Sequence, residues 1–234
     1  MYARTLWFVV CFAVSAVAVA GPKIEYWTLP NGARVYFVPA HELPMVQMRA
    51  VFDAGSSRDP AGKPGLARLV NGLLDEGAAG LSADEIARRF ENLGAEFGSS
   101  SDRDMVTVDL RSLSDSALLD PALDMFARIL STPTFPQENL ERQREQALVG
   151  LQKEAQSPGA IADRKFFRAL YGTHPYAQSP AGDEPGLKAI VRDDLVAFHK
   201  RFYVGANTWF VIMGDVSERA AKRWHPTADA RAHA

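Results

Sequence analysis

Three residues of one predicted helix, Arg68, Asn71 and Gly72, have the spacing of a metal site but not its chemistry. The apolar side of this helix, over residues 65–77, carries five residues at the i, i+3, i+4, i+7 and i+8 positions of a buried face: Leu66, Leu69, Val70, Leu73 and Leu74. Arg68, Asn71 and Gly72 are expected on its polar side. In an H-x-x-E-H motif, their positions hold a zinc-binding histidine, a glutamate base and a second histidine. The sequence therefore predicts the framework of a zinc site without its ligands.

The rest of the sequence offers no second catalytic arrangement. Asp75 and Glu76 are adjacent and point about 100° apart on a helix, so we expect surface acids rather than a paired-carboxylate site. His174 is expected to be structural, and no two histidines outside residues 1–20 have ligand spacing: His41, His174, His199, His225 and His233. Residues 141–145 predict a solvated, charged helix face, and residues 99–101, three serines, the end of a strand and a turn. Neither a G-x-S-x-G elbow nor a Gly-rich phosphate loop occurs.

Composition limits the class of protein. The chain has 234 residues, of which 47% are hydrophobic and 23% charged, enough for one large globular domain or two small ones. Without residues 1–20, which contain Arg4 and no acid, 25 basic and 28 acidic residues leave a net charge of −3. This balance argues against nucleic-acid binding, which needs a basic face. The single cysteine, Cys11, lies in residues 1–20, so the remaining chain has no thiol for catalysis or zinc binding.

Residues 1–20 predict a signal peptide. Arg4 precedes an apolar run over residues 6–17, and Ala18-Val19-Ala20 has the small-x-small form of a signal-peptidase site. We expect cleavage after Ala20 and export to the periplasm or the medium. An uncleaved membrane anchor is the alternative, although the run is short for a spanning helix.

Residues 21–224 predict one α+β domain, and residues 225–234, which are Ala-rich and without apolar periodicity, a disordered tail. Alternating or β-prone apolar residues predict strands at 24–29, 33–38, 46–54, 95–100, 105–113 and 208–213. Helical periodicity and capping signals predict helices at 65–77, 83–93, 114–130, 135–155, 161–171 and 192–202. Pro121 suggests a kink or break in the third helix, and residues 178–185 predict a loop. Because the strands are not in strict βαβ alternation, we expect a mixed or antiparallel sheet packed against helices.

The order of these elements, together with several short motifs, resembles the pitrilysin/insulinase family of zinc peptidases. The motifs are Leu29-Pro30-Asn31-Gly32, Gly65-Leu66-Ala67, Pro158, His174-Pro175-Tyr176, Gly182, Asp194-Leu195 with Phe198, Tyr203, Asn207 and Gly214-Asp215-Val216. The resemblance covers about residues 24–220. It implies a domain like one of the two homologous halves that face each other across a substrate chamber in this family, and the chain is long enough for one half.

The resemblance also implies which positions correspond to the family's zinc site. Its two histidine ligands fall at Arg68 and Gly72, and its glutamate base falls at Asn71. Its third ligand belongs to a pattern of two glutamates seven residues apart, which counting back from Pro158 places at Gln143 and Gly150. Glu138 and Glu145 offer an alternative register for that pair, but not for the first two ligands.

These replacements remove the family's conventional chemistry. Catalytic zinc needs three protein ligands, a water and a base, whereas a guanidinium has no lone pair to donate and an asparagine cannot take up the proton. We therefore expect no catalytic residue, metal or cofactor in this chain, although zinc serves the family. The resemblance implies a non-catalytic exported subunit that pairs with a zinc-bearing relative and binds an extended peptide or protein substrate. The alternatives are an active zinc endopeptidase with unconventional ligands and a structural scaffold subunit.

Overall fold

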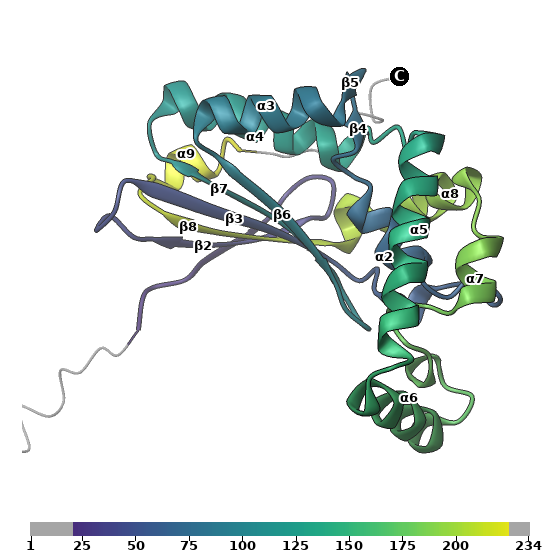
Figure 1. Cartoon of the computed structure of the whole chain (residues 1–234). Helices are drawn as coiled ribbons and strands as arrows, with labels where there is room; N and C mark the ends of the chain where they lie inside the picture. The colour runs from purple at the N-terminus through teal and green to yellow at the C-terminus, as the bar shows by residue number, and fades with distance from the viewer. Residues whose placement is uncertain (1–20, 225–234) are drawn as a thin grey trace, which may run out of the picture.

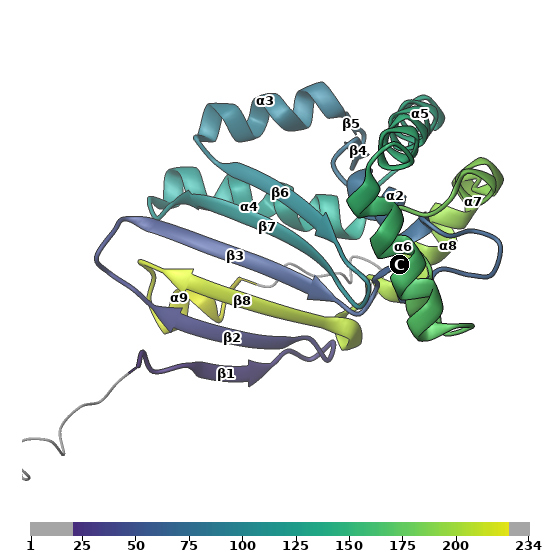
Figure 2. The same cartoon turned by 60° about the horizontal axis from the view of Figure 1, so that its bottom comes forward.

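A six-stranded sheet with helices on one face forms the centre of the molecule (Figure 1). The computed structural model describes residues 21–224, so the predicted signal peptide and C-terminal tail lie outside the described residues. The strands are β1 (Glu25–Thr28), β2 (Arg34–Pro39), β3 (Met45–Phe52), β6 (Glu96–Ser101), β7 (Val106–Leu113) and β8 (Thr208–Gly214). Their order is β1-β2-β8-β3-β7-β6, and Figure 2 shows them side by side. Only the β2–β8 pair is parallel, which confirms the predicted α+β class with a mixed sheet.

The two faces of the sheet have different environments. Helices α3 (Ala83–Leu93), α4 (Ser116–Ser131) and α9 (Glu218–Ala221) lie on one face (Figure 1), where Met48 pairs with both Leu110 and Ile212 and all three side chains are buried. Side chains alternate between the faces along each strand. On the opposite face the register aligns Tyr36 with Val211 and Val211 with Arg49, and these side chains are exposed.

A second group of helices lies at the end of the sheet where β6 finishes (Figures 1 and 2). It contains α2 (Leu66–Gly72), α5 (Gln137–Glu154), α6 (Pro158–Tyr171), α7 (Glu184–Ala189) and α8 (Arg192–Phe202). Short connections complete the described chain: η2 (Ser56–Arg58), β4 (Gly77–Ala78), β5 (Leu81–Ser82), η3 (Pro175–Ala177) and η4 (Gly205–Asn207). None of the helices in residues 21–224 is long and apolar enough to cross a membrane.

Several predicted elements differ from the observed ones, and the helix predicted over residues 161–171 begins earlier, at Pro158. Helix α2 ends at Gly72 rather than near residue 77, because glycine is a poor helix former and the chain then turns through Leu73 into the β4–β5 pair. Helix α4 is continuous through Pro121, which sits near its start, so that the missing N–H removes a single helical hydrogen bond. The predicted loop over residues 178–185 contains the start of α7, whose first turn is capped by Asp183 through the N–H of Gly186, at 2.8 Å.

The segment before α7 packs directly on the segment before α2. A Cβ atom added to Gly182 would lie 2.4 Å from the carbonyl oxygen of Pro64 and 3.0 Å from the Cα of Gly65. Gly182 also has a φ of +78°, in the left-handed region that favours glycine. Glycine at this position therefore permits the close approach of the two segments.

Candidate functional site

The start of α2 is held by a carboxylate from outside the helix. Gly65 occupies the N-cap position and has no side chain to cap the helix. Asp59 takes over this role, since its two carboxylate oxygens accept hydrogen bonds from the N–H groups of Gly65 and Ala67, each at 2.7 Å. This contact fixes the direction in which α2 presents its side chains.

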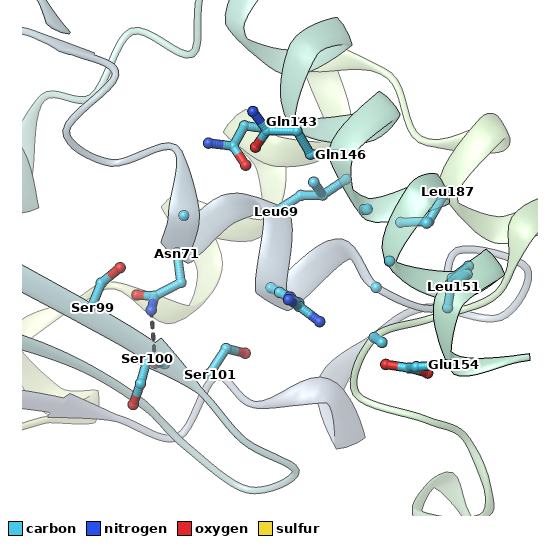
Figure 3. Close-up of a pocket in the computed structure, with 16 residues that line it drawn as sticks. Leu69, Asn71, Ser99, Ser100, Ser101, Gln143, Gln146, Leu151, Glu154 and Leu187 are labelled. Carbon is cyan, nitrogen blue, oxygen red and sulfur yellow. Dashed lines mark hydrogen bonds between the residues drawn. The ribbon is translucent and has the colours of Figure 1, made fainter. Parts of the chain in front are cut away.

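A cleft of about 410 Å³ lies between α2, strand β6 and helix α5. Figure 3 shows Gln143 and Gln146 of α5 opposite the serines of β6, with Glu154 further along α5. The cleft is lined by all five positions that the resemblance assigns to the zinc site: Arg68, Asn71, Gly72, Gln143 and Gly150. Glu138 and Glu145, the alternative register, are exposed and are not part of this lining. Gln143 and Gly150 thus lie on the side of α5 that faces the cleft.

Asn71 is buried, which corrects the prediction that it lies on the polar side of the helix. Only 1% of the residue is exposed. Its Nδ2 donates to the carbonyl oxygens of Ser100, at 2.7 Å (Figure 3), and Thr107, at 3.4 Å, and its Oδ1 accepts a hydrogen bond from the hydroxyl of Tyr203, at 3.1 Å. We call these four residues the Asn71 clamp. The clamp joins α2 to the β6–β7 hairpin and to the end of α8.

In the sequence Tyr203 belongs only to a family-like motif, and its role in the site comes from the structure. Its ring is buried and packs on Phe52 and His199, with ring centroids 4.6 Å and 4.9 Å away. Burial raises the pKa of the Tyr203 hydroxyl well above its usual range, so that the group stays protonated and donates to Asn71. The amide of Asn71 thereby has its acceptor and both donor hydrogens engaged.

Glu76 also differs from its prediction as a surface acid. Its side chain is 16% exposed, and it accepts hydrogen bonds from Asn139, at 2.7 Å, and Gln143, at 3.1 Å, and forms an ion pair with Arg142. This network ties the segment after α2 to α5 and holds the Gln143 amide at the cleft. Burial also raises the pKa of the neighbouring Asp75.

Gly72 and Gly150, which the resemblance places at ligand positions, face open space. A Cβ atom at Gly72 or Gly150 would have no neighbouring heavy atom within 4 Å. No close backbone approach therefore requires glycine there. The cleft consequently has open space at the two positions that the resemblance assigns to a histidine and a glutamate.

The residues at this site do not fit a zinc ion. Arg68 has no lone pair to offer, Asn71 is fully engaged in its clamp, and Gly72 and Gly150 have no side chains. Within residues 21–224, no group of three or more histidine, cysteine, aspartate or glutamate side chains could hold a metal ion. The described histidines lie elsewhere: His199 contacts the carbonyl oxygen of Leu130, His41 pairs with Asp215, and the Nδ1 of His174 accepts from the N–H of Tyr176.

The serines at 99–101, predicted as the end of a strand and a turn, are the last residues of β6 and line the cleft. Strand β6 is last in the sheet order and pairs with β7 alone, so backbone groups on its other side are not used by the sheet. An edge of this kind can receive an extended peptide as an added strand.

Asp59 gives the region a specific pH dependence. Burial raises the pKa of this carboxyl to about 6, although its two backbone hydrogen bonds oppose the shift. Because the native chain holds this proton more tightly than the unfolded chain, Asp59 contributes stability that is lost as the pH rises from about 4 to about 7. We expect Asp59→Asn to remove up to about 3 kcal/mol of this pH dependence. Urea unfolding of the unaltered chain and of the variant across this pH range gives the difference between their free energies of unfolding. A difference that is constant with pH would contradict the buried carboxyl.

Comparisons of this chain with known proteins give matches to one family. A family model described as Insulinase (Peptidase family M16) matches residues 35–184. The crystal structure of a peptidase M16 inactive domain from Pseudomonas fluorescens is 40% identical, with a TM-score of 0.85, and the match covers 90% of this chain and 50% of that chain. The periplasmic protease PqqL from Escherichia coli has the same fold, with a TM-score of 0.78 at 17% identity over 88% of this chain and 24% of its own.

Two curated relatives come from Helicobacter pylori. The zinc protease PqqE is 24% identical over 200 residues, which are 85% of this chain and 45% of that protein. The non-peptidase homolog YmxG is 25% identical over 191 residues, which are 82% of this chain and 43% of that protein. The chain thus spans about half the length of the curated relatives that it matches, and these relatives include proteins named as peptidases and as a non-peptidase.

Proposed function

The chain belongs to the insulinase family of peptidases, M16, and from this premise we propose that it is a catalytically inactive member that binds extended peptides as the partner of a zinc-bearing member. The cleft between α2, β6 and α5 carries this proposal. All five positions that the resemblance assigns to the zinc site line it, and none of them has the histidine, cysteine or carboxylate side chain that zinc prefers and that could act as the base. The cleft is present although its lining lacks the metal ligands, and this combination favours a role in binding rather than in hydrolysis.

The peptide-binding part of the proposal rests on the edge strand. Strand β6 borders the cleft and has an unpaired side, so an extended peptide could form main-chain hydrogen bonds along it while its side chains reach the cleft. This mode of binding needs no metal. It also needs little sequence specificity, which suits a subunit that helps to hold substrates for another active site.

The partnership is supported by the lengths of the relatives. The chain covers 50% of the inactive-domain chain and 45% of PqqE, so its relatives contain a second portion of similar size. We propose that a zinc-bearing M16 protein forms a heterodimer with this chain. We further propose that the pair acts in the periplasm or outside the cell, as the predicted signal peptide suggests.

Co-purification tests the partnership. We expect the tagged chain to retain an H-x-x-E-H protein of the same cell through gel filtration, and peptide cleavage by that protein to rise when the chain is present. Isolation of the chain alone, together with full activity of the zinc protein without it, would contradict the proposal.

Metal analysis tests the inactivity separately. We expect the purified chain to contain less than one zinc ion per ten molecules and to show no peptide hydrolysis that a chelator stops, because the cleft lacks ligands. One zinc ion per chain with chelator-sensitive hydrolysis would instead support an enzyme with unconventional ligands.

A further inference from the structure

Arg68 is a cation without a partner in the wall of the cleft. Its side chain is exposed, and the structure of residues 21–224 gives it neither a hydrogen bond nor an ion pair. Other arginines near the cleft are engaged: Arg142 with Glu76, Arg144 with Glu141, and Arg164 with Glu154, at 2.9 Å. Arg68 therefore remains available to an anion that enters the cleft.

The other groups lining the cleft do not neutralise this charge. Glu154 is the acid among the lining residues, and its carboxylate already pairs with Arg164. Figure 3 shows it further along α5, away from Asn71 and from the two glutamines. The other α5 residues of the lining are uncharged: Gln143, Gln146, Ala147, Gly150 and Leu151. The part of the cleft near α2 thus has an excess positive charge.

A second polar group in the lining also lacks a partner. The hydroxyl of Ser101 is buried and makes no hydrogen bond with the described part of the chain. Buried polar groups in folded proteins are normally satisfied, so such a group needs an explanation. A rotation about χ1 can turn a serine hydroxyl toward a ligand, and Ser101 lies on the edge strand that borders the cleft.

The size and charge of the cleft restrict the ligand. A volume of about 410 Å³ accommodates a few residues of a peptide, and the open space at Gly72 and Gly150 leaves room for a terminal group. One guanidinium matches one carboxylate through two parallel hydrogen bonds. A doubly charged phosphate group would favour further cations, and among the residues lining this cleft Arg68 is the one cation.

We propose that Arg68 binds a carboxylate of the peptide that lies along β6, either the free carboxyl terminus or an acidic side chain. The proposal rests on the peptide-binding role given above and adds its chemical selectivity. Main-chain pairing to β6 holds the peptide irrespective of its sequence, and Arg68 selects peptides that place a carboxylate at the α2 end of the cleft. A guanidinium thereby occupies the position of one of the family's metal ligands and holds an anionic oxygen, while Asn71 is unable to act as a base.

The test uses three fluorescein-labelled nonapeptides of alternating threonine and alanine. The first has a free carboxyl terminus, the second a carboxamide, and the third a carboxamide with glutamate as its last residue. Fluorescence anisotropy measures the dissociation constants with the full chain at low ionic strength. We expect the free acid to bind about tenfold more tightly than the amide, and this ratio to fall as salt is added.

Arg68→Gln should remove the preference, so that acid and amide bind alike, whereas Arg88→Gln should retain it. Arg88 is exposed on α3, so its replacement removes the same charge far from the cleft and controls for net charge. If the glutamate peptide binds as tightly as the free acid, the selected group is any carboxylate; if it binds like the amide, the group is the carboxyl terminus. Equal binding of acid and amide to the unaltered chain would overturn the carboxylate site and leave peptide binding intact. Failure of all three peptides to bind would overturn the peptide-binding role itself.

Discussion

Replacing Asn71 by the isosteric aspartate is expected to lower the free energy of unfolding by about 3 kcal/mol at pH 7. The two carbonyl oxygens of Ser100 and Thr107 now receive hydrogen bonds from the Asn71 amide, and a carboxylate in its place cannot donate. The new charge would face two partial negative charges at a position that is 1% exposed. Only the hydrogen bond from Tyr203 would favour the ionised form.

The pH dependence of this variant distinguishes electrostatics from packing. Because burial and the two carbonyls raise the pKa of such a carboxyl, the deficit should shrink as the pH falls, since the protonated group can donate to Ser100. Urea unfolding at pH 5 and pH 8 measures the effect. Asn92→Asp adds the same charge on the exposed side of α3 and is expected to change stability by less than about 0.5 kcal/mol. An equal loss of stability at both pH values would indicate that the hydrogen bonds donated by Asn71 do not contribute to the Asn71 clamp.

Alanine at Gly182 is expected to lower stability by about 3 kcal/mol. Its Cβ would lie 2.4 Å from the carbonyl oxygen of Pro64, and backbone atoms cannot move aside as the end of a flexible side chain can. The positive φ of +78° adds strain for any residue with a Cβ. Relief of this contact would separate the segment before α7 from the start of α2. The temperature of thermal unfolding should therefore fall, and the cleft should become more mobile.

Gly150→Ala is the matched control for that exchange. It introduces the same methyl group within α5, where a Cβ has no neighbour within 4 Å. Alanine forms helix better than glycine, so stability should rise by about 1 kcal/mol. Thermal or urea unfolding should give changes in stability of opposite sign for the two glycine variants, which would separate steric contact from backbone entropy. Destabilisation by both variants would contradict the open space at Gly150.

The fold was predictable where local signals act alone. Helix α3 has the predicted bounds because Ser82 and Glu85 form a capping box at its start and Gly94, with a φ of +61°, ends it. The end of α2 and the start of α7 were missed for different reasons. In α2 the buried residues Leu73 and Leu74 continue the apolar pattern after the helix has ended. The predicted loop over residues 178–185 overlaps the start of α7, which Asp183 caps.

That positions on α2 and α5 belong to one site is what the family resemblance implies, and helix geometry adds which of them share a face. Residues three and four apart on α2 share a side, and residues seven apart on α5 lie two turns apart on one face, so Arg68, Gly72, Gln143 and Gly150 line the same cleft. The environment of Asn71 was not predictable, because its acceptor group is bound by Tyr203, 132 residues later in the chain. Helical periodicity predicts which face of a helix carries a side chain. It does not predict which residues from other parts of the chain contact that side chain.

Under the proposed inactivity, the Asn71 clamp also affects whether single substitutions could produce the metal-binding motif in this chain. Gly72 and Gly150 face open space, so single substitutions there meet no steric barrier. Glutamate at residue 71 would either oppose the carbonyls of Ser100 and Thr107 or, turned into the cleft, leave the Tyr203 hydroxyl without its acceptor. That step lowers stability before any activity exists to be selected. The clamp is therefore an epistatic barrier to the stepwise formation of that motif, unless the contacts of the β6–β7 hairpin change with it.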